Sequence, residues 1–145
     1  MATFNKVNDF VANAVHNMDL ESDQIVVALS NTAPGSETPN PASDGNGVLA
    51  NVTQITYSNL SSRNVTTTSS TQTGGTYKLV LADITLTSTG GSTGPFRYVY
   101  LFNDTVTSPA DPLIGYYDYG SSLTLSDGDS LTVDFSAANG VLQIA

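Results

Sequence analysis

Few side chains in this 145-residue sequence have the chemistry of catalysis, and they do not form a known catalytic pattern. His16 is the single histidine, and the sequence contains no cysteine. A Ser-His-Asp triad needs a serine on a strained turn, and no Gly-x-Ser-x-Gly motif supplies one. A typical zinc site needs three or four His, Cys or carboxylate ligands. The sequence therefore predicts no triad, no metal site and no cofactor, and an exposed position for His16.

Carboxylates are the remaining candidates for acid–base chemistry. Asp127 and Asp129 flank a glycine, Asp118 lies among tyrosines, and Asp134 alternates with apolar residues. Glycoside hydrolysis requires two facing carboxylates in a cleft. An Asp-Gly pair is instead a turn signal, and alternation with apolar neighbours places Asp134 on a solvent face. We expect turn and surface roles for these carboxylates, no EF-hand calcium site, and a protein that is not an enzyme.

Tyrosines form the densest group of side chains with binding potential: Tyr98, Tyr100, Tyr116, Tyr117 and Tyr119. Tyrosine rings stack on sugars and are enriched in the cores of protein interfaces. The same residues also suit ordinary packing between strands, with their hydroxyls at the rim. Both interpretations remain open at the level of the sequence.

The first 18 residues show apolar side chains at helical spacing, which predicts an amphipathic helix with Thr3 as its N-cap. The stripe consists of Phe4, Val7, Val11, Ala14, Val15 and Met18, and Phe10 widens it. This stripe either packs on the sheet of its own domain or docks on a neighbouring subunit. Residues 1–20 are thus a helix or arm, followed by a β domain over residues 21–145, within one domain of 145 residues.

A segment rich in Pro, Gly, Ser and Asn spans residues 31–47 and is predicted to be a long surface loop. It contains Pro34, Pro39 and Pro41. Loops of this length are often functional or disordered. We consider it either a contact element for a partner or a mobile loop.

Most of the remaining sequence alternates as strands do. The predicted strands are residues 24–29, 52–57, 63–73, 77–86, 96–103, 113–119, 122–125, 131–135 and 141–144. Gly74-Gly75 and Asp127-Gly128 are hairpin signals, and a shift of the apolar parity at Asp83 indicates a bulge or a corner between sheets. Residues 96–103 are apolar on both faces, which is typical of a central strand. The fold class is mostly β, an antiparallel β-sandwich or barrel-like domain with an N-terminal amphipathic helix.

The charge balance limits the partners. The formal net charge is -9, and Lys6, Arg63, Lys78 and Arg97 are the only basic side chains besides His16. Binding to nucleic acid or to anionic membranes relies on clustered Lys and Arg, so we expect neither. No run of about 20 apolar residues and no secretory signal pattern is visible. The absence of cysteine fits folding in a reducing compartment.

Seven segments together resemble virion structural proteins of tailed bacteriophages of the head-decoration, or cement, kind. They are residues 4–11 (FNKVNDFV), 23–34 (DQIVVALSNTAP), 94–99 (GPFRYV), 103–105 (NDT), 112–120 (PLIGYYDYG), 126–135 (SDGDSLTVDF) and 140–145 (GVLQIA). The resemblance implies a homo-oligomer, favouring a trimer, on the outer surface of the head. It also implies that the major capsid protein is the partner and that contacts between capsid subunits are stabilised.

Two other functions remain open, a tail or fibre subunit and a β-sandwich module that binds carbohydrate through Tyr116 to Tyr119. The candidate partner-binding residues are Phe4, Val7, Phe10, Val11, Tyr116, Tyr117, Tyr119, Pro34, Pro39 and Pro41.

Overall fold

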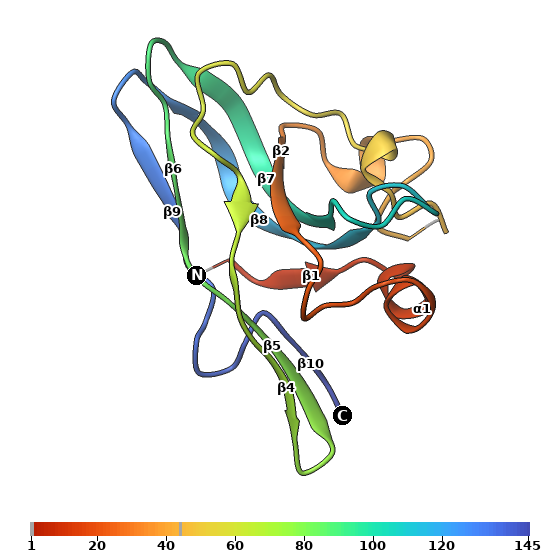
Figure 1. Cartoon of the computed structure of the whole chain (residues 1–145). Coiled ribbons are helices and arrows are strands. Elements are labelled where there is room, and N and C mark those ends of the chain that lie inside the picture. The colour runs from red at the N-terminus through yellow and green to blue at the C-terminus, as the bar shows by residue number, and fades with distance from the viewer. Residues whose placement is uncertain (1, 44) are drawn as a thin grey trace.

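The computed structural model describes residues 2–43 and 45–145, and its paired strands are antiparallel (Figure 1). The strands are β1 (Phe4–Lys6), β2 (Ile25–Ser30), β3 (Asn64–Val65), β4 (Thr67–Thr73), β5 (Thr76–Leu81), β6 (Ile84–Thr87), β7 (Thr93–Asn103), β8 (Leu113–Leu125), β9 (Ser130–Val133) and β10 (Leu142–Ile144). The helix α1 spans Phe10–His16, and the 3-10 helices η1 and η2 span Pro34–Ser36 and Leu49–Asn51. The predicted fold class, mostly β and sandwich-like with a helix near the N-terminus, is confirmed.

A five-stranded sheet with the order β1-β8-β7-β2-β3 forms the centre of the molecule. Its middle strand β7 pairs with β8 from Thr93 to Phe102, with register shifts, and with β2 from Tyr98 to Asn103. Side chains on both faces of β7 are buried, as the apolar residues on both faces of segment 96–103 predicted. Simple alternation would place Phe96 on the same face as Tyr98 and Tyr100, but it lies on the opposite face, because the register with β8 shifts between Phe96 and Tyr98.

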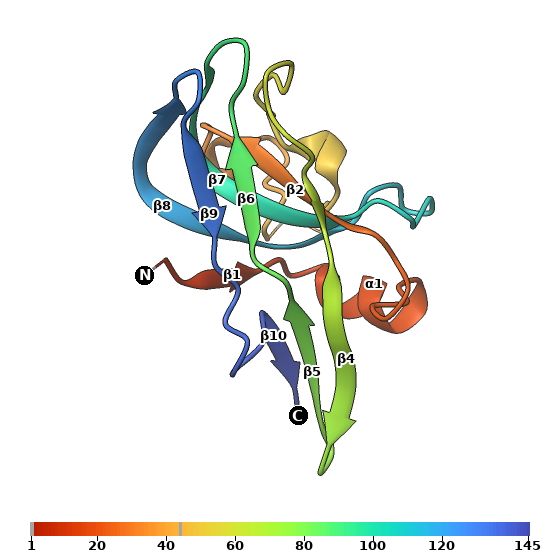
Figure 2. The ribbon, with the colours of Figure 1, turned by 60° about the vertical axis from the view of Figure 1, so that its left-hand side comes forward.

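The larger core lies on one face of this sheet. There, Val27, Leu29 and Leu101 pack against side chains of other layers, including Leu79 of β5 and Leu86 of β6. These layers are a two-stranded sheet, β6-β9, and a three-stranded sheet, β10-β5-β4, which continue one below the other in Figure 2. The chain passes between them at Asp83, whose carboxylate accepts a hydrogen bond of 2.8 Å from the Phe135 backbone N–H. Of the two alternatives predicted at Asp83, a bulge or a corner between sheets, the structure has the corner.

The opposite face of the five-stranded sheet has a second, smaller core. It contains Val26, Tyr98 and Tyr100 from the sheet, with Val7 and Val52 packed among them. The long segment between β2 and β3 supplies its cover, and the predicted loop 31–47 is part of this segment. Backbone hydrogen bonds tie the loop down, from Asn8 N–H to Ala42 O at 3.0 Å and from Leu113 N–H to Gly47 O at 2.8 Å.

The N-terminal helix is shorter than predicted. Residues 4–6 are a strand paired with β8, with Phe4 opposite Tyr117, and the Val7 N–H bonds the Ile114 carbonyl at 3.1 Å. Thr3 is therefore not an N-cap; α1 follows Asp9, whose carboxylate accepts from the Gly47 N–H at 3.0 Å. Pairing with an open sheet edge outweighs weak helix propensity in a short segment.

Four strand predictions also need correction. Segment 63–73 is divided between β3 and β4, which belong to different sheets. Residues 52–57 are irregular, because their polar groups bond individually to the edge of β2, as Ile55 N–H does to Leu29 O at 3.0 Å. Segments 113–119 and 122–125 are one continuous strand, β8. The Asp127-Gly128 turn exists, but β9 pairs with β6 and not with β8, so the turn leads from one sheet into another. The Gly74-Gly75 hairpin between β4 and β5 is confirmed.

Candidate interaction surfaces

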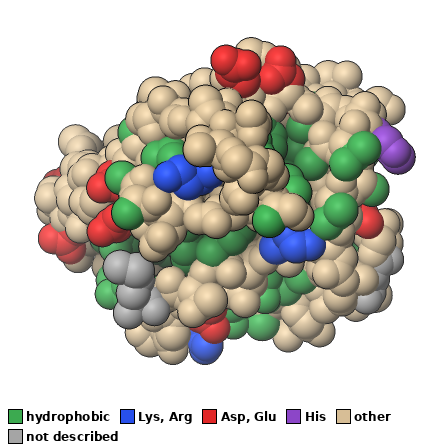
Figure 3. Space-filling view, turned by 90° about the horizontal axis from the view of Figure 1, so that it is seen from below, with side chains coloured by type: hydrophobic (Ala, Val, Ile, Leu, Met, Phe, Trp, Pro, Cys, Tyr) green, Lys and Arg blue, Asp and Glu red, His purple; other side chains and the backbone are tan. Residues whose placement is uncertain are grey.

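The exposed side of α1 and the neighbouring strand β10 form an apolar surface that we call the α1–β10 face. Phe10 turns inward and is buried, whereas Val11 and Val15 are 52% and 78% exposed. Ile144, at the end of β10, is 49% exposed. Two adjoining hollows share Ala14, Val15 and Ile144, so these side chains occupy the middle of one surface. Hydrophobic side chains are visible across this end of the molecule in Figure 3.

Charges of opposite sign stand at the two ends of the α1–β10 face. Lys6 lines the hollow that also contains Phe10 and Val11, and Asp19 and Glu21 line the other hollow. The Asp19 carboxylate accepts hydrogen bonds from the Ser22 hydroxyl at 2.8 Å and the Glu21 N–H at 3.0 Å. These two bonds hold its pKa below the ordinary value and fix the turn that presents Glu21.

Strands β4 and β5 form a hairpin, residues 67–81, that extends beyond the rest of the domain and that we call the projecting hairpin (Figures 1 and 2). Its turn uses Gly74 and Gly75 at φ values of 61° and 87°, which glycine adopts without strain. Residues 71–75 are exposed. Lys78 is the only charged side chain in the hairpin, and hydroxyls dominate β4.

The two faces of β4 differ in their surroundings. The Ser70 hydroxyl lies 2.9 Å from that of Tyr77, and both residues line a hollow of the α1–β10 face. The Ser69 hydroxyl lies 3.2 Å from that of Thr71, two residues along the strand. Because side chains alternate, Thr71 and Thr73 share the face of the hairpin opposite Ser70.

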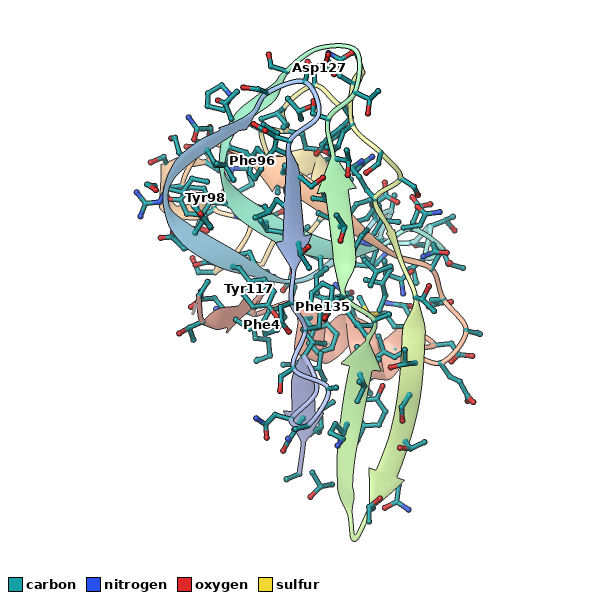
Figure 4. The ribbon with its side chains drawn as sticks, turned by 90° about the vertical axis from the view of Figure 1, so that its left-hand side faces the viewer. Phe4, Phe96, Tyr98, Tyr117, Asp127 and Phe135 are labelled. Atoms are coloured by element: carbon teal, nitrogen blue, oxygen red, sulfur yellow. The ribbon has the colours of Figure 1, made fainter. Side chains whose placement is uncertain are left out.

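The candidate tyrosines do not form one platform. Tyr116 lies in the smaller core, with ring centroids 6.4 Å from Tyr98 and 5.3 Å from Tyr100. Tyr117 points to the other side, between Phe4 and Phe135 at 5.2 and 6.2 Å, as Figure 4 shows.

Burial follows from this packing. It raises the pKa of Tyr117 to about 12 and also raises the pKa values of Tyr100 and Tyr116. Tyr119 alone of the segment 116–119 is exposed by half, beside Leu131 and Val133 of β9.

The other partner-binding candidates divide between the cores and the surface. Val7 and Phe10 are buried, and Phe4 is half-buried beneath Tyr117. In the loop, Pro34 and Pro41 are buried and Pro39 is half-buried. Of the ten candidates, Val11 and Tyr119 are the two that present a large exposed side chain.

Two exposed residues central to the α1–β10 face were absent from the candidate set, Val15 and Ile144. Val15 follows Val11 by four residues, which places both on one side of a helix. This spacing could have singled out the pair once a seven-residue helix was expected. Ile144 carried no such signal, because its exposure depends on where β10 lies beside β5.

The carboxylates have structural contacts. Asp118 receives two hydrogen bonds from Arg97, at 2.7 and 2.8 Å, and one from the Gly120 N–H. The Arg97 guanidinium is the main reason that the pKa of Asp118 is lowered. Asp127 accepts from the Gly90 N–H and Asp129 from the Ser126 N–H, so both fasten turns. Asp134 lines the hollow beside Tyr119 and is exposed, and so is His16 at the end of α1.

Within residues 2–43 and 45–145, no group of three or more His, Cys, Asp or Glu side chains is placed to hold a metal ion. Across the same part of the chain, none of the helices has the length and apolar character needed to cross a membrane.

No family model, curated protein sequence or solved structure matches this chain.

Proposed function

We propose that this protein is a non-enzymatic capsid decoration subunit of a tailed bacteriophage. In this role it binds the outer surface of the head as a homo-oligomer and stabilises contacts between major capsid proteins. The observation that carries the proposal is the projecting hairpin, a polar but nearly uncharged extension of a body that is already packed on both faces of its central sheet. The resemblance of the seven sequence segments to cement proteins supports the same role.

The composition of the hairpin suits a contact surface between proteins. Burying a charged group costs far more free energy than burying a hydroxyl that finds a hydrogen-bond partner, and interface cores are depleted in charged residues. The outward side chains of β4 include Thr71 and Thr73, which can both donate and accept hydrogen bonds. Strand β4 contributes no charge to this surface, and the ammonium group of Lys78, which lies opposite Thr71 on β5, donates a hydrogen bond of 3.0 Å to the Ala138 carbonyl.

The edge position of β4 adds a second means of attachment. In the sheet order β10-β5-β4, β4 has a strand on one side only. An edge strand presents unpaired backbone N–H and C=O groups, and a segment of another protein can pair with them as an added strand. Contacts with more than one capsid subunit at once would raise the overall affinity through effective concentration.

The net charge of -9 is consistent with a place outside the shell. Binding to packaged DNA depends on neutralising phosphates with Lys and Arg, and this chain has only four such residues. The proposal therefore assigns the protein to the outer surface of the virion, where the protein shell separates it from the genome.

Substitutions on the outward face of the hairpin test the proposal. We expect Thr71→Arg with Thr73→Arg to leave folding intact and to weaken binding to empty shells, assembled from the major capsid protein of the source phage, by at least about tenfold. Thr107→Arg, in the exposed loop after β7, is the matched control and should bind as the wild type does. Binding is measured by co-sedimentation with the shells.

A map of the virion by cryo-electron microscopy provides the positional test. Density for the chain between capsomers on the outside of the head supports the proposal. Density in the tail, or shell binding that the paired threonine substitutions leave unchanged, contradicts it.

A further inference from the structure

The α1–β10 face has a property that the projecting hairpin lacks, because it combines exposed apolar side chains with separated charges of opposite sign. Val11, Val15 and Ile144 are three of the four large hydrophobic side chains left exposed by the described residues. Lys6 stands at one end of the face and Glu21 at the other, with Val15 and Ile144 between them.

We propose that this face binds the same face of a second copy of the chain around a two-fold axis. A two-fold axis through the middle of the face places the two copies antiparallel. A residue at one end of the face in one copy then contacts the residue at the other end in its partner, and each such contact occurs twice. Lys6 of each copy then lies against Glu21 of its partner, and the apolar centres of the two copies cover one another.

The charges of the chain favour one relative orientation of the two copies. Two molecules with a net charge of -9 repel each other over most of their surfaces. The α1–β10 face contains one of the few basic side chains, Lys6, together with acidic groups at the far end. Antiparallel placement opposes this repulsion with two attractive Lys6–Glu21 pairs, whereas parallel placement would set Lys6 against Lys6.

The outward threonine face of β4 is not part of this contact. Ser70 and Tyr77 border the α1–β10 face, and Thr71 and Thr73 lie on the other side of the hairpin. A pair of chains therefore keeps two hairpins available, and a dimer that places both on one shell would gain affinity by avidity. The contact itself is a property of the isolated chain and does not depend on the proposed capsid role.

Charge reversal at the two ends tests the geometry. Lys6→Glu and Glu21→Lys should each weaken self-association by at least about tenfold, because each sets like charges together at both pairs. Mixing the two variants in equal amounts should restore association, because a pair with one copy of each variant has opposite charges at both contacts. Sedimentation equilibrium from about 1 to 100 µM at low salt measures these affinities, since screening weakens such pairs.

Asp104→Lys is the matched control for Glu21→Lys, because it changes the net charge by the same amount in an exposed loop after β7. If general repulsion governed association, both variants would associate more tightly than the wild type. The two-fold contact predicts that Glu21→Lys alone associates more weakly. Val15→Asp should abolish the pair, and circular dichroism checks that each variant is folded.

Three results would overturn the inference: a monomer throughout the concentration range, a trimer or larger ring, or a dimer that mixing of the two charge variants fails to restore. A monomer that still binds shells would remove this inference and leave the capsid role in place. A dimer that does not bind shells would support the two-fold contact and contradict the capsid role.

Discussion

The five-stranded sheet and the projecting hairpin are both made of antiparallel strands, but they differ in how their faces are covered. Strand β7 buries side chains on both faces, between a large core and a smaller one. Strand β4 carries Thr and Ser at six of its seven positions, and its last three residues are exposed. The central sheet therefore contributes most of the buried core, whereas the end of the hairpin is accessible for contact with other molecules.

The N-terminal segment connects these two kinds of region. Val7, just before α1, and Phe10, its first residue, belong to the cores, whereas Val11 and Val15 of α1 face solvent. One amphipathic segment thus both completes the fold and forms part of a candidate interface. Packing on its own domain involves Phe10, whereas the docking on a neighbour that we propose would involve Val11 and Val15.

The largest effect is expected at Phe10. Phe10→Ala removes a ring that is 2% exposed in the larger core, and such a truncation costs about 3–5 kcal/mol of unfolding free energy. Val15→Ala, five residues further along the chain, removes a side chain that is 78% exposed and should change the unfolding free energy by less than about 0.5 kcal/mol. Urea denaturation measures both. Similar losses for the two variants would show that the exposed side of α1 also belongs to the core.

A smaller loss is expected at Gly115 of β8, which pairs with β1 and has the Phe4 ring and the Asn5 carbonyl close to it. A Cβ at this position would lie 2.7 Å from the Asn5 carbonyl oxygen and would clash with the Phe4 ring. Gly115→Ala should therefore cost about 1–3 kcal/mol, as overpacking does.

Gly35→Ala is the control for Gly115→Ala, since the nearest atom to its added Cβ is 4.0 Å away. Thermal unfolding monitored by circular dichroism compares the two glycine variants. Equal melting temperatures for Gly115→Ala and the wild type would mean that β1 is not held against β8 in solution.

Several parts of the fold could be predicted from local sequence pattern. The two apolar faces of segment 96–103 identified the central strand, and the parity shift at Asp83 predicted a bulge or a corner, of which the structure has the corner. Gly74-Gly75 identified a hairpin because its backbone conformation favours glycine. Each of these signals depends on a few neighbouring residues.

The features that were missed depend on partners far away in the sequence. Segment 4–6 has a helical apolar spacing, yet β8, more than 100 residues later, recruits it as a strand. Asp127-Gly128 indicates a turn, but nothing local shows that β9 will pair with β6. The α1–β10 face joins the two ends of the chain, so the sequence offered Val11 as a candidate without Ile144 or Lys6.

The Arg97–Asp118 pair, on the surface of the central sheet, should contribute a small, pH-dependent term. The pKa of Asp118 is lowered in the folded protein, so its ionisation stabilises the fold above the unfolded value near 3.8 and this contribution is lost as pH falls below it. We expect Asp118→Asn to lower the melting temperature slightly at pH 6 and to match the wild type near pH 2. Arg97→Gln should remove the same pH-dependent term, because the guanidinium is its main cause. A difference that persists at pH 2 would assign the effect to packing.

The smallest change in stability is expected on the outward face of the projecting hairpin. Thr73→Val keeps the shape and strand preference of the side chain and removes a hydroxyl that is exposed, so unfolding free energy should change by less than about 0.5 kcal/mol. Ser88→Ala is the comparison in the body, where the buried hydroxyl donates to the Gly91 carbonyl at 2.7 Å and lies 2.8 Å from that of Thr93. Its loss should cost about 1–3 kcal/mol. Urea denaturation compares the two variants. If Thr73→Val lowers the unfolding free energy as much as Ser88→Ala does, the hairpin hydroxyls stabilise the fold itself, and the outward face of the hairpin is not available to bind the capsid.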